Sequence, residues 1–260
     1  MKKIAILIAF AMIICCVPVF ADNSVGTNIV EQADDEYFNI AEKYLKGDGV
    51  ERDFSLAKKN YEISASKGNP KALERIGLMY HMGLGVNVDY KVAKDYYEKS
   101  AALNCGDAYY ELGVMYENGH GVERNYQTAK SYYEAGANLN NEFSLLNLGF
   151  LYINGKGVNK DLQKAKECFE KAGDLNNPVA LYNLGLMYHD GNGVKQDYAK
   201  AIFYYEKASE LGFSDAMVNL AFMYYTATGV SKDYNKAVEY LKKAVAAGNQ
   251  KAAMILAQIS

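Results

Sequence analysis

Apolar and small residues recur along the chain with a period of 36 residues. The segment 73–80 returns, without insertions, at 109–116, 145–152, 181–188 and 217–224. The same unit stands earlier at 37–44, and a truncated copy occupies 253–260. A fixed period of this length is typical of stacked helix pairs. The pattern therefore predicts six full repeats and a C-terminal half-repeat.

Each repeat contains the signals of two helices joined by a glycine turn. In the first helix, apolar residues stand at relative positions 0, 3 and 7, as in Leu181, Leu184 and Tyr188, which is one face of a helix. The chain then reads Gly-x-Gly-Val, as at Gly191 and Gly193. Two glycines there end a helix and permit the positive φ angles of a tight reversal.

The second helix of each repeat has a start signal, an inner column and a stop signal. It begins after an aspartate or asparagine, the residues preferred as N-caps, and ends at a glycine or asparagine, which tolerate the left-handed conformation. A column of alanines lies between them. We expect the glycines inside the first helices to face these alanines. The columns are Asp53, Asp89, Asn125, Asp161, Asp197 and Asp233; Gly68, Asn104, Asn140, Asn176, Gly212 and Gly248; Ala93, Ala129, Ala165 and Ala201; and Gly77, Gly113, Gly149 and Gly185.

These elements predict an all-α fold. Stacked helix pairs form a right-handed α/α superhelical solenoid, in which each unit touches only its neighbours. The solenoid is expected to span residues 36–260. Residues 22–35 are polar and acidic without periodicity, and are expected to form a flexible lead-in.

The first 21 residues have the pattern of a secretory signal peptide. Two lysines precede an apolar stretch from 4 to 17, and residues 19–21 fit a cleavage site after Ala21. The apolar stretch is shorter than the roughly 20 residues that cross a bilayer. The sequence thus predicts a periplasmic or secreted protein, with a retained anchor or lipid attachment at Cys15 or Cys16 as alternatives.

Charge and cysteine content narrow the partners further. The whole chain has a net charge of −3, and removal of Lys2 and Lys3 would leave −5. An acidic surface disfavours binding to nucleic acid or to anionic membranes. Of the remaining cysteines, Cys105 and Cys168 lie in repeats separated by a whole unit, beyond the reach of about 7 Å between Cα atoms that a disulfide requires. Two separate thiols are expected.

The repeat columns closely resemble the Sel1-like repeat, a relative of the tetratricopeptide repeat. The resemblance covers residues 36 to 260, with tyrosine in place of the family's tryptophan at Tyr96, Tyr132, Tyr204 and Tyr240. It implies an α/α superhelix that serves as an adaptor for protein complexes. The fifth repeat matches the family pattern at Ala180, Leu184, Gly185, Tyr188, Gly191, Gly193, Val194, Asp197, Lys200, Ala201, Tyr204, Tyr205, Lys207, Ala208 and Gly212.

Recognisable catalytic chemistry is sparse. Ser64 and Lys67 match the Ser-x-x-Lys of penicillin-recognising enzymes, but the accompanying elements are missing, and Ser64 stands in a small-residue column. A helix-packing role is therefore favoured. His81 and His189 are three repeats apart and His120 lies in a glycine turn, so the histidines are interpreted as surface residues without a shared metal. No catalytic residue, cofactor or metal site is predicted.

The expected binding surface is the concave face formed by the first helices. Asparagines recur there at the repeat spacing, and amides both donate to and accept from a peptide backbone. Their alternative role is satisfaction of neighbouring backbone groups. Aromatic residues beside them offer pockets for side chains. The candidate residues are Tyr110, Asn147, Phe150, Tyr182, Asn183, His189, Asn219 and Tyr225.

Three functions remain open. The first is an exported adaptor that binds a protein or peptide in this groove. The second is a β-lactam or peptidoglycan hydrolase like the cysteine-rich branch of the family, although the cysteine pairs of that branch are missing here. The third is a purely structural spacer. The apolar C-terminal half-repeat, with Met254, Ile255 and Leu256, either caps the stack or forms a weak self-association contact.

Overall fold

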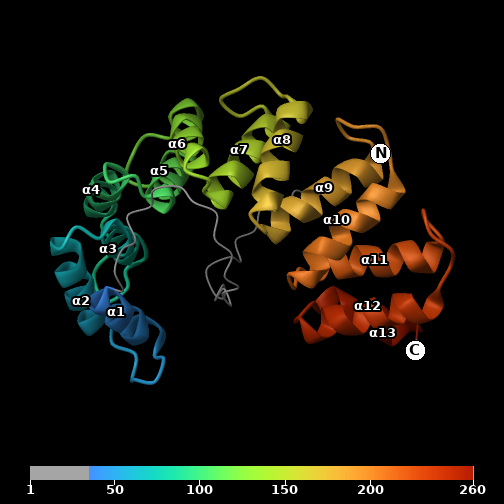
Figure 1. Cartoon of the computed structure of the whole chain (residues 1–260), viewed down its shortest axis with the longest axis horizontal. Coiled ribbons are helices and arrows are strands. Elements are labelled where there is room, and N and C mark those ends of the chain that lie inside the picture. Colours follow the sequence, from blue (N-terminus) through green and yellow to red (C-terminus); the bar gives the residue numbers. More distant parts are fainter. Residues whose placement is uncertain (1–34, 260) are drawn as a thin grey trace. The chain divides into compact units, whose positions relative to one another are not determined.

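In a computed structural model, residues 35–259 form thirteen α-helices joined by short turns (Figure 1). The predicted signal peptide, the predicted lead-in up to residue 34 and Ser260 lie outside the described residues. The helices are α1 (Glu36–Lys46), α2 (Phe54–Ser66), α3 (Pro70–Met82), α4 (Tyr90–Ala101), α5 (Gly106–Asn118), α6 (Tyr126–Asn138), α7 (Glu142–Asn154), α8 (Leu162–Asp174), α9 (Pro178–Asp190), α10 (Tyr198–Glu210), α11 (Ser214–Thr226), α12 (Tyr234–Ala246) and α13 (Gln250–Ile259).

The helices stack in chain order. Each odd-numbered helix up to α11 packs against the next even-numbered helix, and each even-numbered helix packs against the first helix of the following pair. First helices of neighbouring pairs also contact one another, α3 with α5 and α5 with α7. The first helices therefore form the inner side of the stack and the second helices its outer side. This arrangement confirms the predicted all-α repeat solenoid.

The predicted starts and stops of the second helices are confirmed. All six begin after an aspartate or asparagine whose side chain accepts one or two backbone N–H bonds. The stop column has positive φ throughout, including 56–63° at Asn104, Asn140 and Asn176. The first helices have a cap column of their own, which the sequence analysis missed: Asn69, Asn141, Asn177 and Asn249 cap α3, α7, α9 and α13.

The glycines inside the first helices meet aromatic rings, which corrects the expectation that they face alanines. A Cβ atom added at any of them would lie 2.3–2.7 Å from a ring atom of the residue 20 positions later. An alanine side chain is too short to fill the space between paired helices, whereas a ring from the next turn fills it completely. The opposed pairs are Gly77 with Tyr97, Gly113 with Tyr133, Gly149 with Phe169, and Gly185 with Tyr205.

The two end pairs relax this arrangement. Ala41 packs in one buried cluster with Tyr61, and Ala221 packs in another with Leu241. Leu241 is shorter than the rings of the inner pairs, which leaves room for the Ala221 methyl group, whereas Ala41 shares its cluster with a full tyrosine ring. The paired rings are inaccessible to water: Tyr61, Tyr97, Tyr133 and Phe169 are each 0 % exposed.

The Gly-x-Gly turns join neighbouring repeats. From the second repeat onward, the last glycine of the turn packs on the first residue of the preceding second helix, as Gly121 does on Tyr90 and Gly157 on Tyr126. Each turn of one repeat thereby lies over the helix start of the previous repeat. The turn is consequently a packing element as well as a connection.

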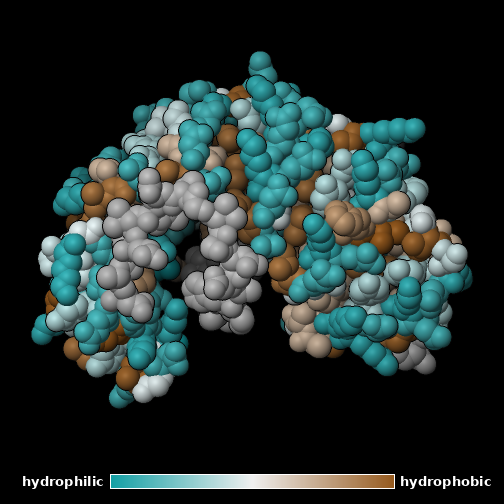
Figure 2. Space-filling model, in the orientation of Figure 1, coloured by the Kyte–Doolittle hydropathy of each residue, from teal (hydrophilic) through white to brown (hydrophobic). Residues whose placement is uncertain are grey.

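Both described cysteines are free, as predicted, and both are buried. Each helix of the described part falls short of the length and apolar character that a bilayer crossing requires. On the face shown in Figure 2, hydrophobic residues appear in bands and small patches among hydrophilic residues.

Gly149→Ala is expected to destabilise the fold by about 1–3 kcal/mol, because the new methyl group overlaps the Phe169 ring. The sign of the change in unfolding free energy tests the contact, since alanine is otherwise favoured over glycine inside a helix by about 1 kcal/mol. Urea unfolding followed by circular dichroism measures the effect. The double variant Gly149→Ala with Phe169→Leu reproduces the Ala221–Leu241 pairing. Its loss of unfolding free energy should therefore be smaller than the sum of the losses in the two single variants. A stable single variant would contradict this packing argument.

Ala227→Gly is expected to stabilise the fold by about 0.5–1 kcal/mol. Ala227 ends α11 with φ 59°, where the five preceding repeats have glycine. Thermal unfolding measures the change. Gly191→Ala at the matching position of α9 is the reverse control and should lower the melting temperature.

Candidate binding surface on the first helices

The inner face of the solenoid is formed by side chains that project from the first helices. Among the predicted candidates, Asn147 and Asn219 point at tyrosine hydroxyls. The Asn147 amide donates to the Tyr133 hydroxyl over 3.1 Å, and the Asn219 amide donates to the Tyr182 hydroxyl over 3.5 Å. Tyr133 comes from α6, the second helix of the preceding pair. An amide of one repeat is thus bonded to a ring of the one before it.

Asn183 makes a different contact. Phe169 stands where its tyrosine partner would be and has no hydroxyl, so the Asn183 amide donates to the Val179 carbonyl of its own helix over 2.7 Å. Its side-chain oxygen is left to accept another donor, and the residue is half-buried. Within the asparagine column, Asn183 is therefore bonded to its own helix, whereas Asn147 and Asn219 donate to tyrosine hydroxyls.

Tyr110, Phe150 and Tyr182 are half-buried and each packs on an aromatic residue of the buried column. The Tyr110 and Tyr133 ring centroids are 6.3 Å apart, and the Phe150 and Phe169 centroids are 5.4 Å apart. Tyr182 contacts Tyr205 at 5.8 Å. The inner face therefore presents aromatic edges that are supported from beneath by the ring column.

Tyr182 also takes part in a second aromatic contact. Its ring lies 5.0 Å from that of Phe213, the residue that precedes α11. Burial raises the pKa of the Tyr182 phenol. With Asn219, these two rings form a compact aromatic and amide cluster on neighbouring repeats.

His189 and Tyr225 lie further along the same side, near the ends of α9 and α11. His189 Nδ1 is 2.7 Å from a carboxylate oxygen of Asp190, and the His189 ring lies edge-on to Tyr198. Tyr225 is 44 % exposed, and neighbouring Phe222 is 61 % exposed. The structure thus brings Tyr182 and Asn219 together, and Asn147 and Tyr110 around Tyr133, while His189 and Tyr225 lie apart from those clusters.

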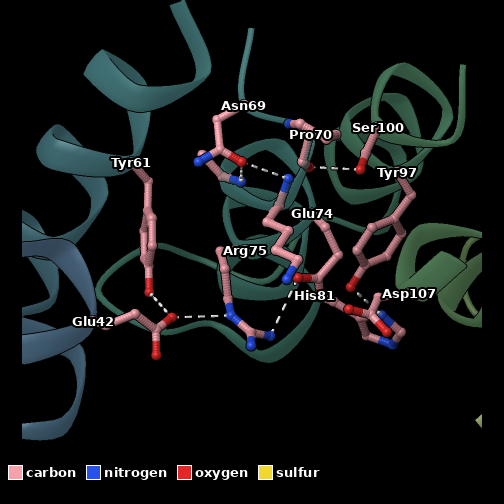
Figure 3. A network of polar contacts seen from close by, with 12 residues as sticks. Glu42, Tyr61, Asn69, Pro70, Glu74, Arg75, His81, Tyr97, Ser100 and Asp107 are labelled. Carbon is pink, nitrogen blue, oxygen red and sulfur yellow. Dashed lines mark hydrogen bonds and ion pairs between the residues drawn. The ribbon is translucent and has the colours of Figure 1, made fainter. Parts of the chain in front are cut away.

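A charged network in the first three repeats was missed by the sequence analysis (Figure 3). The Tyr61 hydroxyl donates to Glu42 over 2.5 Å. The Arg75 guanidinium donates to Glu42 over 3.1 Å and to Glu74 over 3.2 Å. Glu74 is 3 % exposed, so this carboxylate depends on Arg75 for its charge compensation. The network links α1, α2 and α3.

The network continues into α5 through Asp107 and Glu111. Asp107 accepts from the Asn141 amide over 2.7 Å. Glu111 is half-buried, and removal from water together with the charges of Glu74 and Asp107 raises its pKa to about 8. Burial likewise raises the pKa of Glu74, although Arg75 opposes this shift. The N-terminal half of the inner face is therefore acidic at its centre.

One signal in the sequence could have identified this network. Arg75 and Glu111 occupy the same repeat position as Asn147, Asn183 and Asn219. The column begins with Asn39, is charged only at Arg75 and Glu111, and is asparagine again from Asn147 to Asn219. A change of residue type within a single column indicates a local interaction rather than the shared packing of the repeats.

Two histidines are adjacent, contrary to the interpretation of all three as separate surface residues. His81 Nε2 and His120 Nδ1 are 3.0 Å apart, and both residues are half-buried. His120 lies in the turn that follows α5, and that turn packs back on the preceding repeat. Burial and the neighbouring His120 lower the pKa of His81 to about 4.

The same junction recurs one repeat later with different residues. Lys156, at the position that matches His120, lies 3.6 Å from Glu117, which matches His81. The residue near the end of a first helix thus contacts the middle residue of the next glycine turn. Within residues 35–259, no three histidine, cysteine or acidic side chains are placed to hold a metal ion.

Both side chains of the Ser-x-x-Lys motif make contacts with residues of the first repeat. Ser64 is 0 % exposed and its hydroxyl donates to the Asp35 carboxylate. The Lys67 ammonium lies 4.0 Å from the centroid of the Tyr37 ring. These contacts agree with a packing role for Ser64.

Ionisation of Glu111 is expected to oppose folding. The stability contributed by its neutral form is full below its ordinary pKa of 4.5 and is lost as the pH rises through about 8. Glu111→Gln should therefore stabilise the protein at pH 8 by roughly 1–3 kcal/mol, and much less at pH 5. Urea unfolding at both pH values measures the difference. Glu210→Gln, on the exposed side of α10, is the control; equal effects of both substitutions would contradict the argument.

Comparison with known proteins agrees with the repeat architecture. The family model described as Sel1 repeat matches residues 37–69, 70–105, 106–141, 143–177, 178–213 and 214–249. A comparison with curated proteins gave no match.

Solved structures show the same fold. A Sel1 repeat protein from Oxalobacter formigenes is 30% identical, with 81% of this chain and 86% of that chain covered and a TM-score of 0.75. A protective antigen of uropathogenic Escherichia coli, c5321, is 28% identical with a TM-score of 0.60, covering 86% of this chain and 56% of that one. The immunity protein Pa5087 from Pseudomonas aeruginosa is 24% identical, covering 83% and 82%, with a TM-score of 0.59, which shows the fold alone. On these matches and on its six repeats, the chain belongs to the Sel1 repeat family.

Proposed function

We propose that this chain is an adaptor that binds a protein or peptide along the inner face of its first helices. Sel1 repeat proteins typically serve as adaptors for protein interactions, and the proposal assigns that role to one surface. The observation that carries it is the cluster of Tyr182, Phe213 and Asn219, which combines half-buried rings with an amide on two adjacent repeats. Aromatic residues of this kind supply much of the binding energy in protein interfaces.

Asn183 lies beside this cluster in the sequence and supports the same surface. Its side-chain oxygen remains available to a backbone N–H group, while Tyr182 offers an apolar face. A peptide that lies across α9 and α11 would meet an amide and an aromatic ring at the repeat spacing. The exposed Phe222 and Tyr225 extend the apolar surface towards the end of α11.

Export and self-association form part of the proposal. Residues 1–21 carry the pattern of a cleaved signal peptide, and a periplasmic or secreted location follows from it. At the C-terminal end of the described residues, α13 packs on α12 and leaves Met254 68 % exposed. A weak contact between two copies through α13 would cover this side chain.

Affinity capture from an envelope extract tests the binding surface. The native chain is compared with a variant in which Asn147, Tyr182, Asn183 and Asn219 are changed to alanine. We expect at least about a tenfold loss of affinity for the captured partner, or about 1.4 kcal/mol or more. A matched control changes four exposed residues of the second helices, Gln127, Gln163, Asn235 and Lys242, to alanine.

Folding must be separated from binding in this experiment. Asn147 bonds to a buried tyrosine, so its loss will lower stability, and circular dichroism melting curves verify each variant. The pair Asn183→Ala and Tyr225→Ala gives a milder variant, because Asn183 bonds to its own helix and Tyr225 packs on Tyr234 at the start of the next helix. Equal capture by all variants would place binding elsewhere. Failure of the native chain to capture a partner would favour a spacer role.

A further inference from the structure

A second tyrosine array joins the first and second helices of single repeats. In four repeats, the tyrosine near the end of the first helix stacks on a tyrosine 16 positions later. The ring centroids are 5.5–6.0 Å apart and the rings are within 22° of parallel. The pairs are Tyr80 with Tyr96, Tyr116 with Tyr132, Tyr188 with Tyr204, and Tyr224 with Tyr240.

Lysines complete this array. The Lys200 ammonium lies 5.0 Å from the centroid of Tyr188, and Lys236 lies 4.9 Å from that of Tyr224. An aromatic ring is attracted both to a parallel neighbour and to a cation over its face. The fifth and sixth repeats therefore each have two stacked rings and a lysine over the first ring.

The fourth repeat has the first ring and the lysine without the second ring. Tyr152 is half-buried and Lys164 lies 5.5 Å from its centroid, but Cys168 stands where the stacking tyrosine would be. A pocket of about 230 Å³ opens there among α6, α7 and α8. Tyr152, Cys168, Leu145 and Leu148 line it.

We propose that this pocket binds an aromatic side chain of a partner protein, which stacks on Tyr152 as the internal tyrosines do in the neighbouring repeats. The pocket is smaller than the roughly 300–1,000 Å³ of typical small-molecule sites, which suits one side chain. Lys164 and Lys171 stand with Glu134 and Glu167 in the pocket lining, so both signs of charge are available to the polar edge of a tyrosine or tryptophan.

The thiol contributes to this pocket as an apolar wall. Cys168 is 9 % exposed, and burial raises its pKa to about 11. It is therefore neutral near pH 7 and behaves as a small hydrophobic side chain. The inference is independent of the proposed inner-face function, because the residues that line the pocket are different from the candidate residues of the inner face.

Tryptophan fluorescence of a small probe tests the proposal, since the chain contains no tryptophan. The full chain is titrated with N-acetyl-L-tryptophanamide. We expect a saturable blue shift, with displacement by N-acetyl-L-tyrosinamide and none by N-acetyl-L-leucinamide. Cys168→Tyr restores the missing ring and should weaken binding by about tenfold or more, with a melting temperature at or above that of the native chain. Cys168→Ala leaves the pocket open and should retain binding.

Two further variants keep the test decisive. Tyr152→Leu removes the stacking ring while the pocket stays open, and should also abolish the blue shift. Tyr182→Ala, on the inner face, should leave it unchanged. The proposal would be overturned if the native chain gave no saturable shift, or if the leucine amide displaced the probe as well as the tyrosine amide does. Unchanged binding by folded Cys168→Tyr or by Tyr152→Leu would also overturn it. Loss of binding in Tyr182→Ala would show that the probe binds at the inner face, and this result would also overturn the proposal.

Discussion

In α3, α5, α7 and α9, a glycine is in close contact with an aromatic ring of the following helix, and this contact determines much of the structure. With no Cβ at Gly113 or Gly149, the ring of Tyr133 or Phe169 lies directly against the helix backbone. Glycine inside a helix is costly, and burial of a whole ring offsets that cost. The distance between the two helices of a pair follows from this contact, and with it the positions of the residues on both sides of the layer.

The binding surface depends on the same rings. The hydroxyl of Tyr133 emerges on the inner side, where it contacts Asn147 of the next repeat and Glu117 of its own. Where the buried ring is Phe169, the hydroxyl is missing and Asn183 turns to its own helix backbone. The choice between tyrosine and phenylalanine in the core thus decides whether an inner-face amide donates to a ring hydroxyl of the preceding repeat, as Asn147 does, or to its own helix, as Asn183 does.

The sequence was sufficient for the fold but only partly for the site. Helix boundaries, caps and left-handed stops could be predicted because each depends on residues close together in the chain. The contact of Gly113 with Tyr133 spans 20 residues and two helices, so spacing alone did not distinguish it from a contact with the alanine column. The approach of His81 and His120, which are 39 positions apart, depends on how the glycine turn folds back on the preceding repeat. Such pairings between different repeat columns follow from the stacking geometry, which one sequence does not reveal.

That folded-back turn has a consequence for how the chain can be recombined. Removal of residues 106–141, one whole unit, would retain the glycine–ring pairs of the remaining repeats. It would nevertheless bring Lys156 against His81, in place of the present partners Glu117 and His120. The core contacts are therefore the same in the different repeats. The contacts between the end of a first helix and the next glycine turn, in contrast, are specific to each neighbouring pair. Shuffling of units would act first on these paired side chains, long before it disturbed the helices themselves.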